Sequence, residues 1–170
     1  MTLRSGRWGL RSVVAAMMVV VAAACGGDSP ALKVDEIDEA VAAVIATTGG
    51  DASFFEINAT PDLVNLFLDD KRGSAINFVW ENGELRDETE AAPADGRSFD
   101  ASGMNFIADV YEQVEKELPD SLLRAFTITA DGPNGEILHR VVIQSERGGQ
   151  FAVLVDPTGK ILGSDPLTGP

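Results

Sequence analysis

Apolar residues recur every three or four positions in two stretches of this chain, which is the spacing of one face of an α-helix. The first stretch follows Ser29-Pro30, which supplies an N-cap and a first-turn proline, and it stops at Gly49-Gly50. The second stops at Pro119. The two stretches therefore predict two amphipathic helices. The apolar positions are Val34, Ile37, Val41 and Ile45, and then Ile107, Val110, Val114 and Leu118.

Each predicted helix is followed by short alternating or apolar segments, which predict β-strands. Matching positions of the two halves, such as Val34 and Ile107 or Phe55 and Phe126, lie 71 to 76 residues apart, which indicates an internal repeat. Turns close both halves, and Asn82-Gly83 in the first favours a type I′ hairpin. The predicted strands cover 55–57, 63–68 and 75–80 in the first half, and 126–128, 137–143 and 151–155 in the second.

These elements predict an α+β fold of two repeats, each a helix plus a three-stranded antiparallel sheet, with both helices packed on one sheet face. The first repeat spans 32–85 and the second 103–165, with an acidic linker at 86–102 and a tail at 166–170. A half of about 60 residues buries too little surface to be stable alone. We therefore expect the halves to share a core or to extend one sheet.

The first 24 residues have the layout of a secretory signal peptide, with a basic start, a short apolar core and small residues before the cleavage site. Arg4, Arg7 and Arg11 precede an apolar run from Val13 to Ala24. This run is shorter than the roughly 20 apolar residues that a membrane-spanning helix needs. We expect residues 1–24 to be removed from the mature protein.

The segment Val21-Ala22-Ala23-Ala24-Cys25 resembles the bacterial lipobox, in which a cysteine after small residues is acylated and becomes the new N-terminus. The lipobox usually has Leu where this chain has Ala22. Cys25 is the only cysteine, so no intramolecular disulfide accounts for it. The resemblance implies a lipoprotein held on the extracytoplasmic face of the cell membrane by lipid on Cys25, with residues 25–31 as a tether. The alternative is a secreted protein whose Cys25 lies in or near the cleaved peptide.

Net charge excludes one class of function. From Cys25 onward the chain holds all 27 acidic residues but only 10 of the 13 basic ones, which gives a net charge of −17. A protein that binds nucleic acid by neutralising phosphates needs a basic surface, so no nucleic-acid partner is expected. The same charge repels anionic lipid headgroups, so we expect contact with the membrane only through the acyl chains.

The end of the second half resembles a PepSY-type domain, a helix and a three-stranded antiparallel sheet that closes with a Thr-Gly-Lys turn. The first half keeps only the glycine turn of this signature. The resemblance implies an extracytoplasmic, non-catalytic module that often regulates or inhibits a partner such as a peptidase. The residues that carry it are Phe151, Val153, Val155, Asp156, Thr158, Gly159, Lys160, Ile161 and Leu162.

Candidate catalytic chemistry is sparse. Nucleophilic catalysis wants a base beside the nucleophile, but the chain has one histidine, His139 within a predicted strand, and no Gly-x-Ser-x-Gly motif. Cys25 would be consumed by lipid. The acidic runs lack the Asp-x-Asp-x-Asp-Gly calcium loop, and zinc ligands are too few. We therefore expect no enzyme activity, no cofactor and no metal.

Three functions remain open. The favoured one is a tethered binding or regulatory module for an envelope protein or peptide. The second is a carrier of a lipid or other apolar ligand in a cavity between the sheet and the helices, lined by Phe55, Phe67, Phe78 and Trp80. The third is a hydrolase, which needs two carboxylates that converge in a cleft.

Overall fold

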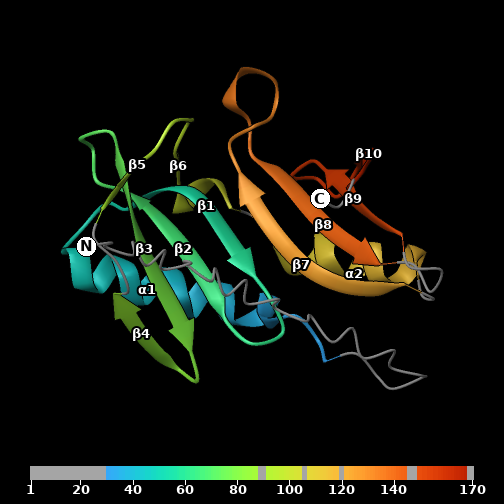
Figure 1. The fold of residues 1–170 in the computed structure, drawn as a ribbon, viewed down its shortest axis with the longest axis horizontal. Helices are drawn as coiled ribbons and strands as arrows, with labels where there is room; N and C mark the ends of the chain where they lie inside the picture. The colour runs from blue at the N-terminus through green and yellow to red at the C-terminus, as the bar shows by residue number, and fades with distance from the viewer. Residues whose placement is uncertain (1–29, 88–90, 105–106, 119–120, 145–148, 168–170) are drawn as a thin grey trace, which may run out of the picture.

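The computed structural model describes residues 30–87, 91–104, 107–118, 121–144 and 149–167, which form one long sheet with helices behind it (Figure 1). The helical elements are η1 (Lys33–Glu36), α1 (Ile37–Thr48), η2 (Ala101–Gly103), α2 (Ile107–Glu117) and η3 (Pro133–Gly135). The strands are β1 (Ser53–Ala59), β2 (Val64–Asp69), β3 (Ser74–Glu81), β4 (Glu84–Asp87), β5 (Ala92–Pro93), β6 (Phe99–Asp100), β7 (Leu122–Thr129), β8 (Leu138–Gln144), β9 (Gln150–Val155) and β10 (Ile161–Pro166).

The main path of the sheet runs β10-β9-β8-β7-β1-β2-β3-β4, with every neighbouring pair antiparallel. The strands β1 and β7 join its two ends at the centre, with Ile57 opposite Ile128 and Asn58 opposite Thr127. The Asn58 Nδ2 donates a hydrogen bond to Thr127 Oγ1 at 3.1 Å across this junction. The two four-stranded groups therefore form one continuous surface.

The prediction of two helix-plus-three-stranded repeats is wrong. The strands form a single ten-stranded antiparallel sheet, and β4 and β10 each follow the three strands that were predicted in their half. The segment predicted as a linker also supplies β5 and β6, which pair with β3 and β1. Alternation marks which residues of a strand share a face, but not which edge of a strand finds a partner. An unpaired edge leaves backbone groups open, so the structure extends the pairing further than the pattern indicates.

One core lies between the sheet and the helices. Both α1 and α2 lie behind the sheet in Figure 1. The ring of Tyr111 on α2 packs edge to face on that of Phe126 on β7, with the ring centroids 6.3 Å apart. Along β2 and most of β8, buried side chains alternate with half-buried ones on the opposite face. The core is shared by both groups of strands, and it contains Ile37, Val44, Phe54, Ile57, Val64, Leu66, Val114, Phe126, Ile128 and Ile143 among its buried members.

Two turn positions behave as the sequence predicts. The helix α1 ends at Thr48, and Gly49 follows with a left-handed φ of 81°, so that its N–H donates to the Ile45 carbonyl at 3.0 Å. Asn82 and Gly83 both have positive φ, 55° and 78°, as a type I′ turn requires. This turn sends the chain from β3 back along β4.

We expect Ile128→Ala to lower the free energy of unfolding by about 2–5 kcal/mol, since it opens a cavity at the β1–β7 junction. The matched control is Ile161→Ala, because the Ile161 side chain on β10 is 40% exposed. That change should cost less than about 0.5 kcal/mol, as is usual for surface positions. Denaturant unfolding measures both. Equal losses in the two variants would contradict the central role of the junction.

Candidate functional site

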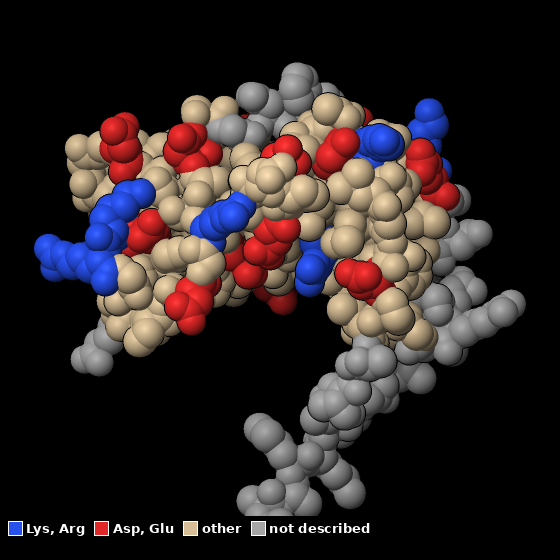
Figure 2. Space-filling model, turned by 90° about the horizontal axis from the view of Figure 1, so that it is seen from above, with Lys and Arg blue, Asp and Glu red and all other residues tan. Residues whose placement is uncertain are grey.

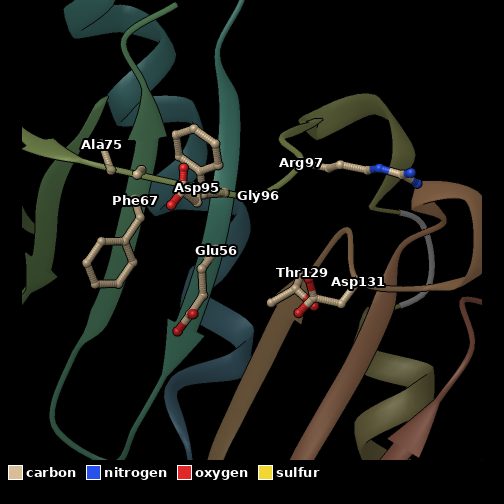
Figure 3. Close-up of a pocket in the computed structure, with 10 residues that line it drawn as sticks. Glu56, Phe67, Ala75, Asp95, Gly96, Arg97, Thr129 and Asp131 are labelled. Carbon is tan, nitrogen blue, oxygen red and sulfur yellow. The ribbon is translucent and has the colours of Figure 1, made fainter. Parts of the chain in front are cut away.

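A hollow of about 270 Å³ lies on the sheet face that the helices leave open (Figure 3). Its floor comes from neighbouring strands, and its wall comes from the segment between β5 and β6. Its lining combines apolar and acidic side chains with one arginine. The lining residues are Phe55, Glu56, Phe67, Ala75, Ala94, Asp95, Gly96, Arg97, Thr129 and Asp131.

A β-bulge in β1 brings two consecutive side chains to this hollow. Phe54 pairs with Leu68 and Glu56 pairs with Phe67, so Phe55 is the extra residue. The side chains of Phe54 and Ile57 are both fully buried in the core. A bulge redirects side chains in this way because it inserts one residue into the regular alternation. As a result both Phe55 and Glu56 line the hollow.

The segment from Ala94 to Ser98 crosses the end of β2 to form the wall. It is held on one side by β5, which pairs with β3, and on the other by β6, which pairs with β1. Ser98 Oγ also donates a hydrogen bond of 2.8 Å to Oδ2 of Asp69, the last residue of β2. Burial alone would raise the pKa of Asp69, but the hydrogen bonds from Ser98 and Lys71 outweigh it and lower the pKa.

The hollow carries negative charge that no cation of the described residues neutralises by an ion pair, since none of the ion pairs there involves Glu56, Asp95 or Asp131. Burial raises the pKa of the Glu56 carboxyl, and the charge of Asp131 raises it further. A hydrogen bond from Asn58 and the charge of Arg140 oppose this shift only in part.

Arg97 is the basic residue of the lining, and its side chain points away from the carboxylates (Figure 3). It lies against Gly135 instead, where a Cβ would come within 2.8 Å of Arg97 Nη1. Gly135 has a φ of 85°, in the left-handed region that favours glycine. Figure 2 shows acidic side chains scattered among uncharged residues on the face seen from above, with the basic ones in separate patches.

The structure divides the four phenylalanine and tryptophan residues that were predicted to line one cavity. Phe55 and Phe67 line the hollow on the open face. Phe78 and Trp80 lie on the covered face, 5% and 8% exposed, within the core. The four side chains therefore do not surround a common space between sheet and helices. Cys25 lies outside the described residues.

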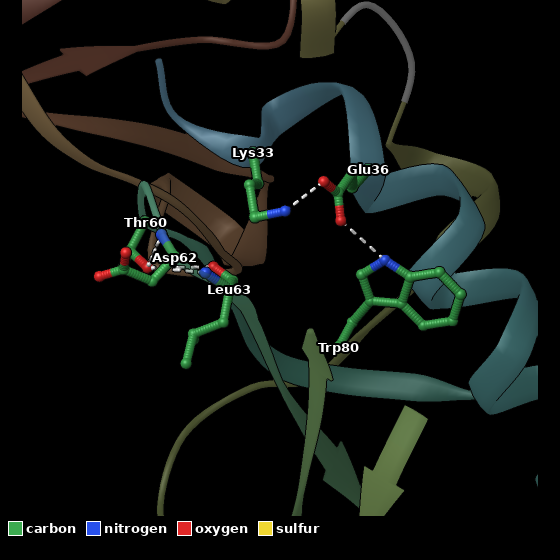
Figure 4. Close-up of polar contacts among 6 residues, drawn as sticks. All are labelled: Lys33, Glu36, Thr60, Asp62, Leu63 and Trp80. Carbon is green, nitrogen blue, oxygen red and sulfur yellow. Dashed lines mark hydrogen bonds and ion pairs between the residues drawn. The ribbon is translucent and has the colours of Figure 1, made fainter. Parts of the chain in front are cut away.

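Trp80 has a structural contact of its own (Figure 4). Its indole Nε1 donates a hydrogen bond to Glu36 Oε2 at 3.0 Å, and Glu36 also forms an ion pair with Lys33. The backbone N–H of Lys33 donates to the Thr60 carbonyl at 3.0 Å, and Thr60 Oγ1 accepts from the N–H groups of Asp62 and Leu63. These contacts fix η1 to β3 and to the β1–β2 turn.

Glu56, Asp95 and Asp131 were not among the residues predicted to form a site. They belong to a bulged strand, to a segment predicted as a linker and to the turn after β7. The one sequence signal is Phe54-Phe55-Glu56, where two consecutive phenylalanines interrupt the alternation. That signal marks an irregular strand, but it does not show which carboxylates meet.

His139 belongs to the core. It is fully buried in β8, stacks on Phe126 with ring centroids 5.5 Å apart, and neither ring nitrogen has a hydrogen-bond partner among the described residues. Burial lowers the pKa of His139 below its usual 6.5, and the nearby Asp156 opposes this only in part. The ring is therefore neutral and closed off from solvent at pH 7.

Within the described segments, no three histidine, cysteine, aspartate or glutamate residues are grouped so that they could hold a metal ion. No helix of these segments is long and apolar enough to cross a membrane.

Comparison with known proteins gives a fold but no family. No protein-family model matches the chain, and no curated protein matches it by sequence. The PepSY-type resemblance of Phe151–Leu162 therefore gains no support from a family match. Among solved structures, the chain is similar to a predicted lipoprotein from Clostridium difficile 630, with a TM-score of 0.52 over 82% of this chain and 95% of that chain. The sequence identity is 14%, so this likeness shows a shared fold alone.

We expect the folded protein to lose stability as the pH falls below about 6.5, because the unfolded chain then binds a proton at His139 that the folded chain does not. The loss should reach up to about 1.4 kcal/mol per pH unit until the folded-state pKa is passed. His139→Leu should flatten this part of the pH profile. Denaturant unfolding between pH 7.5 and 5.5 tests it, since a variant with the wild-type slope would contradict the assignment.

Proposed function

We propose that this protein is an exported lipoprotein, held on the extracytoplasmic face of the cell membrane by lipid on Cys25, whose sheet binds an envelope protein or peptide without catalysis. The signal-peptide layout of residues 1–24 and the lipobox-like residues before Cys25 support the anchor. The shared fold with a predicted lipoprotein agrees with it.

The path of the chain supports a partner that lies close to the membrane. Residues 26–32 span at most about 25 Å when extended, so the folded part stays near its anchor. The chain then meets the sheet at the β1–β2 turn, through the Lys33 hydrogen bond to Thr60. Glu56 of the hollow lies four residues back along β1, about 13 Å away at the usual rise of a strand. The hollow therefore lies close to the point where the tether joins the sheet, so a partner bound there would itself be near the membrane.

The open sheet face with its hollow is the observation that carries the binding role. Helices cover one face of the sheet, whereas the other presents Phe55, Phe67 and unpaired carboxylates to solvent. Specific polar groups beside an apolar surface are typical of binding sites. The single histidine of the chain is sealed in the core, so it offers no exposed base for catalysis.

A second candidate is a hydrolase in which Glu56 donates a proton and Asp131 acts as the base. It is favoured by the position of both carboxylates in the lining of one hollow, together with the raised pKa of Glu56. We rank it second because glycosidases stack sugars on aromatic platforms, and Trp80 faces the core instead. Turnover of chromogenic glycosides that Glu56→Gln abolishes would reverse this ranking.

We expect the mature N-terminus to be Cys25 with added acyl mass, and we expect Cys25→Ala to lose that mass and to leave the membrane fraction. The change removes the thiol that lipid would occupy without touching the described fold. Mass spectrometry of the N-terminal peptide and fractionation of cells measure it. A wild-type protein that begins downstream of Cys25, or that carries no acyl mass, would contradict the anchor.

We expect a photo-crosslinking residue at Ala94, in the wall of the hollow, to capture a discrete partner in intact cells. The matched control is Ala46, an exposed position on α1, which lies on the opposite side of the sheet. Crosslinked bands are measured by immunoblotting and identified by mass spectrometry. The same bands at both positions, or none at Ala94, would count against the binding role.

A further inference from the structure

The hollow beside β1 carries an uncompensated charge. Glu56 is half-buried, Asp131 adds a second carboxylate, and Asp95 lies in the wall. The cation of the lining, Arg97, turns toward Gly135, and Arg140 opposes the negative charge only in part. A partly desolvated carboxylate gains most from a positive partner, because the local dielectric is lower than in water. A positively charged group is therefore the partner that these carboxylates favour.

The walls of the hollow suit a chain of methylene groups. Phe55 and Phe67 contribute aromatic surface next to Glu56, and Ala75 and Ala94 contribute small apolar surface. Lysine and arginine pack their stems along such surface while the charged end stays hydrated or paired. An aromatic ring near the charged end adds a cation–π attraction.

The size of the hollow limits the ligand. About 270 Å³ lies below the roughly 300–1,000 Å³ that is typical of sites for drug-sized molecules. It matches one long side chain or a small amine better than a lipid or a sugar chain. The net charge of −14 for the whole chain also attracts a cation from a distance.

We propose that this hollow binds an ammonium or guanidinium group on an apolar stem, either the side chain of a lysine or arginine in a peptide or a free alkylamine, with Glu56 and Asp131 as its anionic partners. This rests on the proposed function, because it names the chemistry that the binding face recognises. It adds a property that the fold alone does not contain, namely which side chain of a partner the face selects.

Calorimetric titration of the full-length protein in a non-ionic detergent tests the proposal. The probes are alanine pentapeptides with a central lysine, methionine or glutamate, and free n-pentylamine. We expect the lysine peptide to bind at least about tenfold more tightly than the methionine and glutamate peptides, an effect between those of exposed and buried ion pairs. If pentylamine binds as tightly as the lysine peptide, the site takes the free amine; if it binds more weakly, the peptide is the source.

Three variants separate the site from general charge. Glu56→Gln and Asp131→Asn should each weaken binding of the lysine peptide about tenfold, whereas Glu84→Gln, an equal charge change on the exposed strand β4, should change it less than about twofold. Thermal melts verify that each variant is folded. If Glu56→Gln does not fold, the binding affinity of Asp131→Asn tests the proposal in its place. Equal binding of the lysine and methionine peptides, or an equal loss in Glu84→Gln, would overturn the proposal. If either of these results were found while Ala94 still crosslinked to a discrete partner, the proposed binding role would stand and only the proposed ligand class would be rejected.

Discussion

The strands β1 and β7 pair over four residues, and this contact turns two four-stranded groups into one sheet with one core. Each group alone would leave the facing edge of β1 or of β7 unpaired. It would also leave Ile57 or Ile128 at the margin of a small core instead of at its centre. Pairing satisfies the backbone groups of both edges and buries apolar surface from both halves together. The contact therefore fixes where the helices lie and which face of the sheet stays open.

The open face owes its hollow to two irregularities at one end of β1. The bulge at Phe55 sends two consecutive side chains toward the same face, and the segment between β5 and β6 crosses the end of β2 above them. Neither feature would form a site alone. The bulge supplies Phe55 and Glu56, and the crossing segment supplies the wall that partly removes them from water. A half-buried carboxylate beside aromatic surface is the chemical result.

The contacts of η1 connect this sheet to the proposed membrane anchor. Glu36 accepts a hydrogen bond from Trp80 and pairs with Lys33, while the Lys33 backbone is bonded to the β1–β2 turn. Because Trp80 is packed in the core, these contacts join η1 firmly to β3 and to the β1–β2 turn. An anchor at Cys25 would then keep this end of the sheet close to the membrane, since a short tether leads into a fixed segment.

The sequence by itself determined the local features. The stop of α1 at Gly49, the turn at Asn82-Gly83 and the alternation of the long strands follow from neighbouring residues, so a pattern along the chain reveals them. The charge balance and the position of Cys25 are equally properties of the sequence. The small size of each half predicted a shared core or one extended sheet, but only the tertiary structure decided that β1 pairs with β7, that Phe78 and Trp80 face the core while Phe67 faces the hollow, and that Glu56 and Asp131 line the same hollow. These outcomes arise from pairing between residues about 70 positions apart and from a one-residue bulge. Neither leaves a periodic trace in the sequence, because each is set by which surfaces can be buried together.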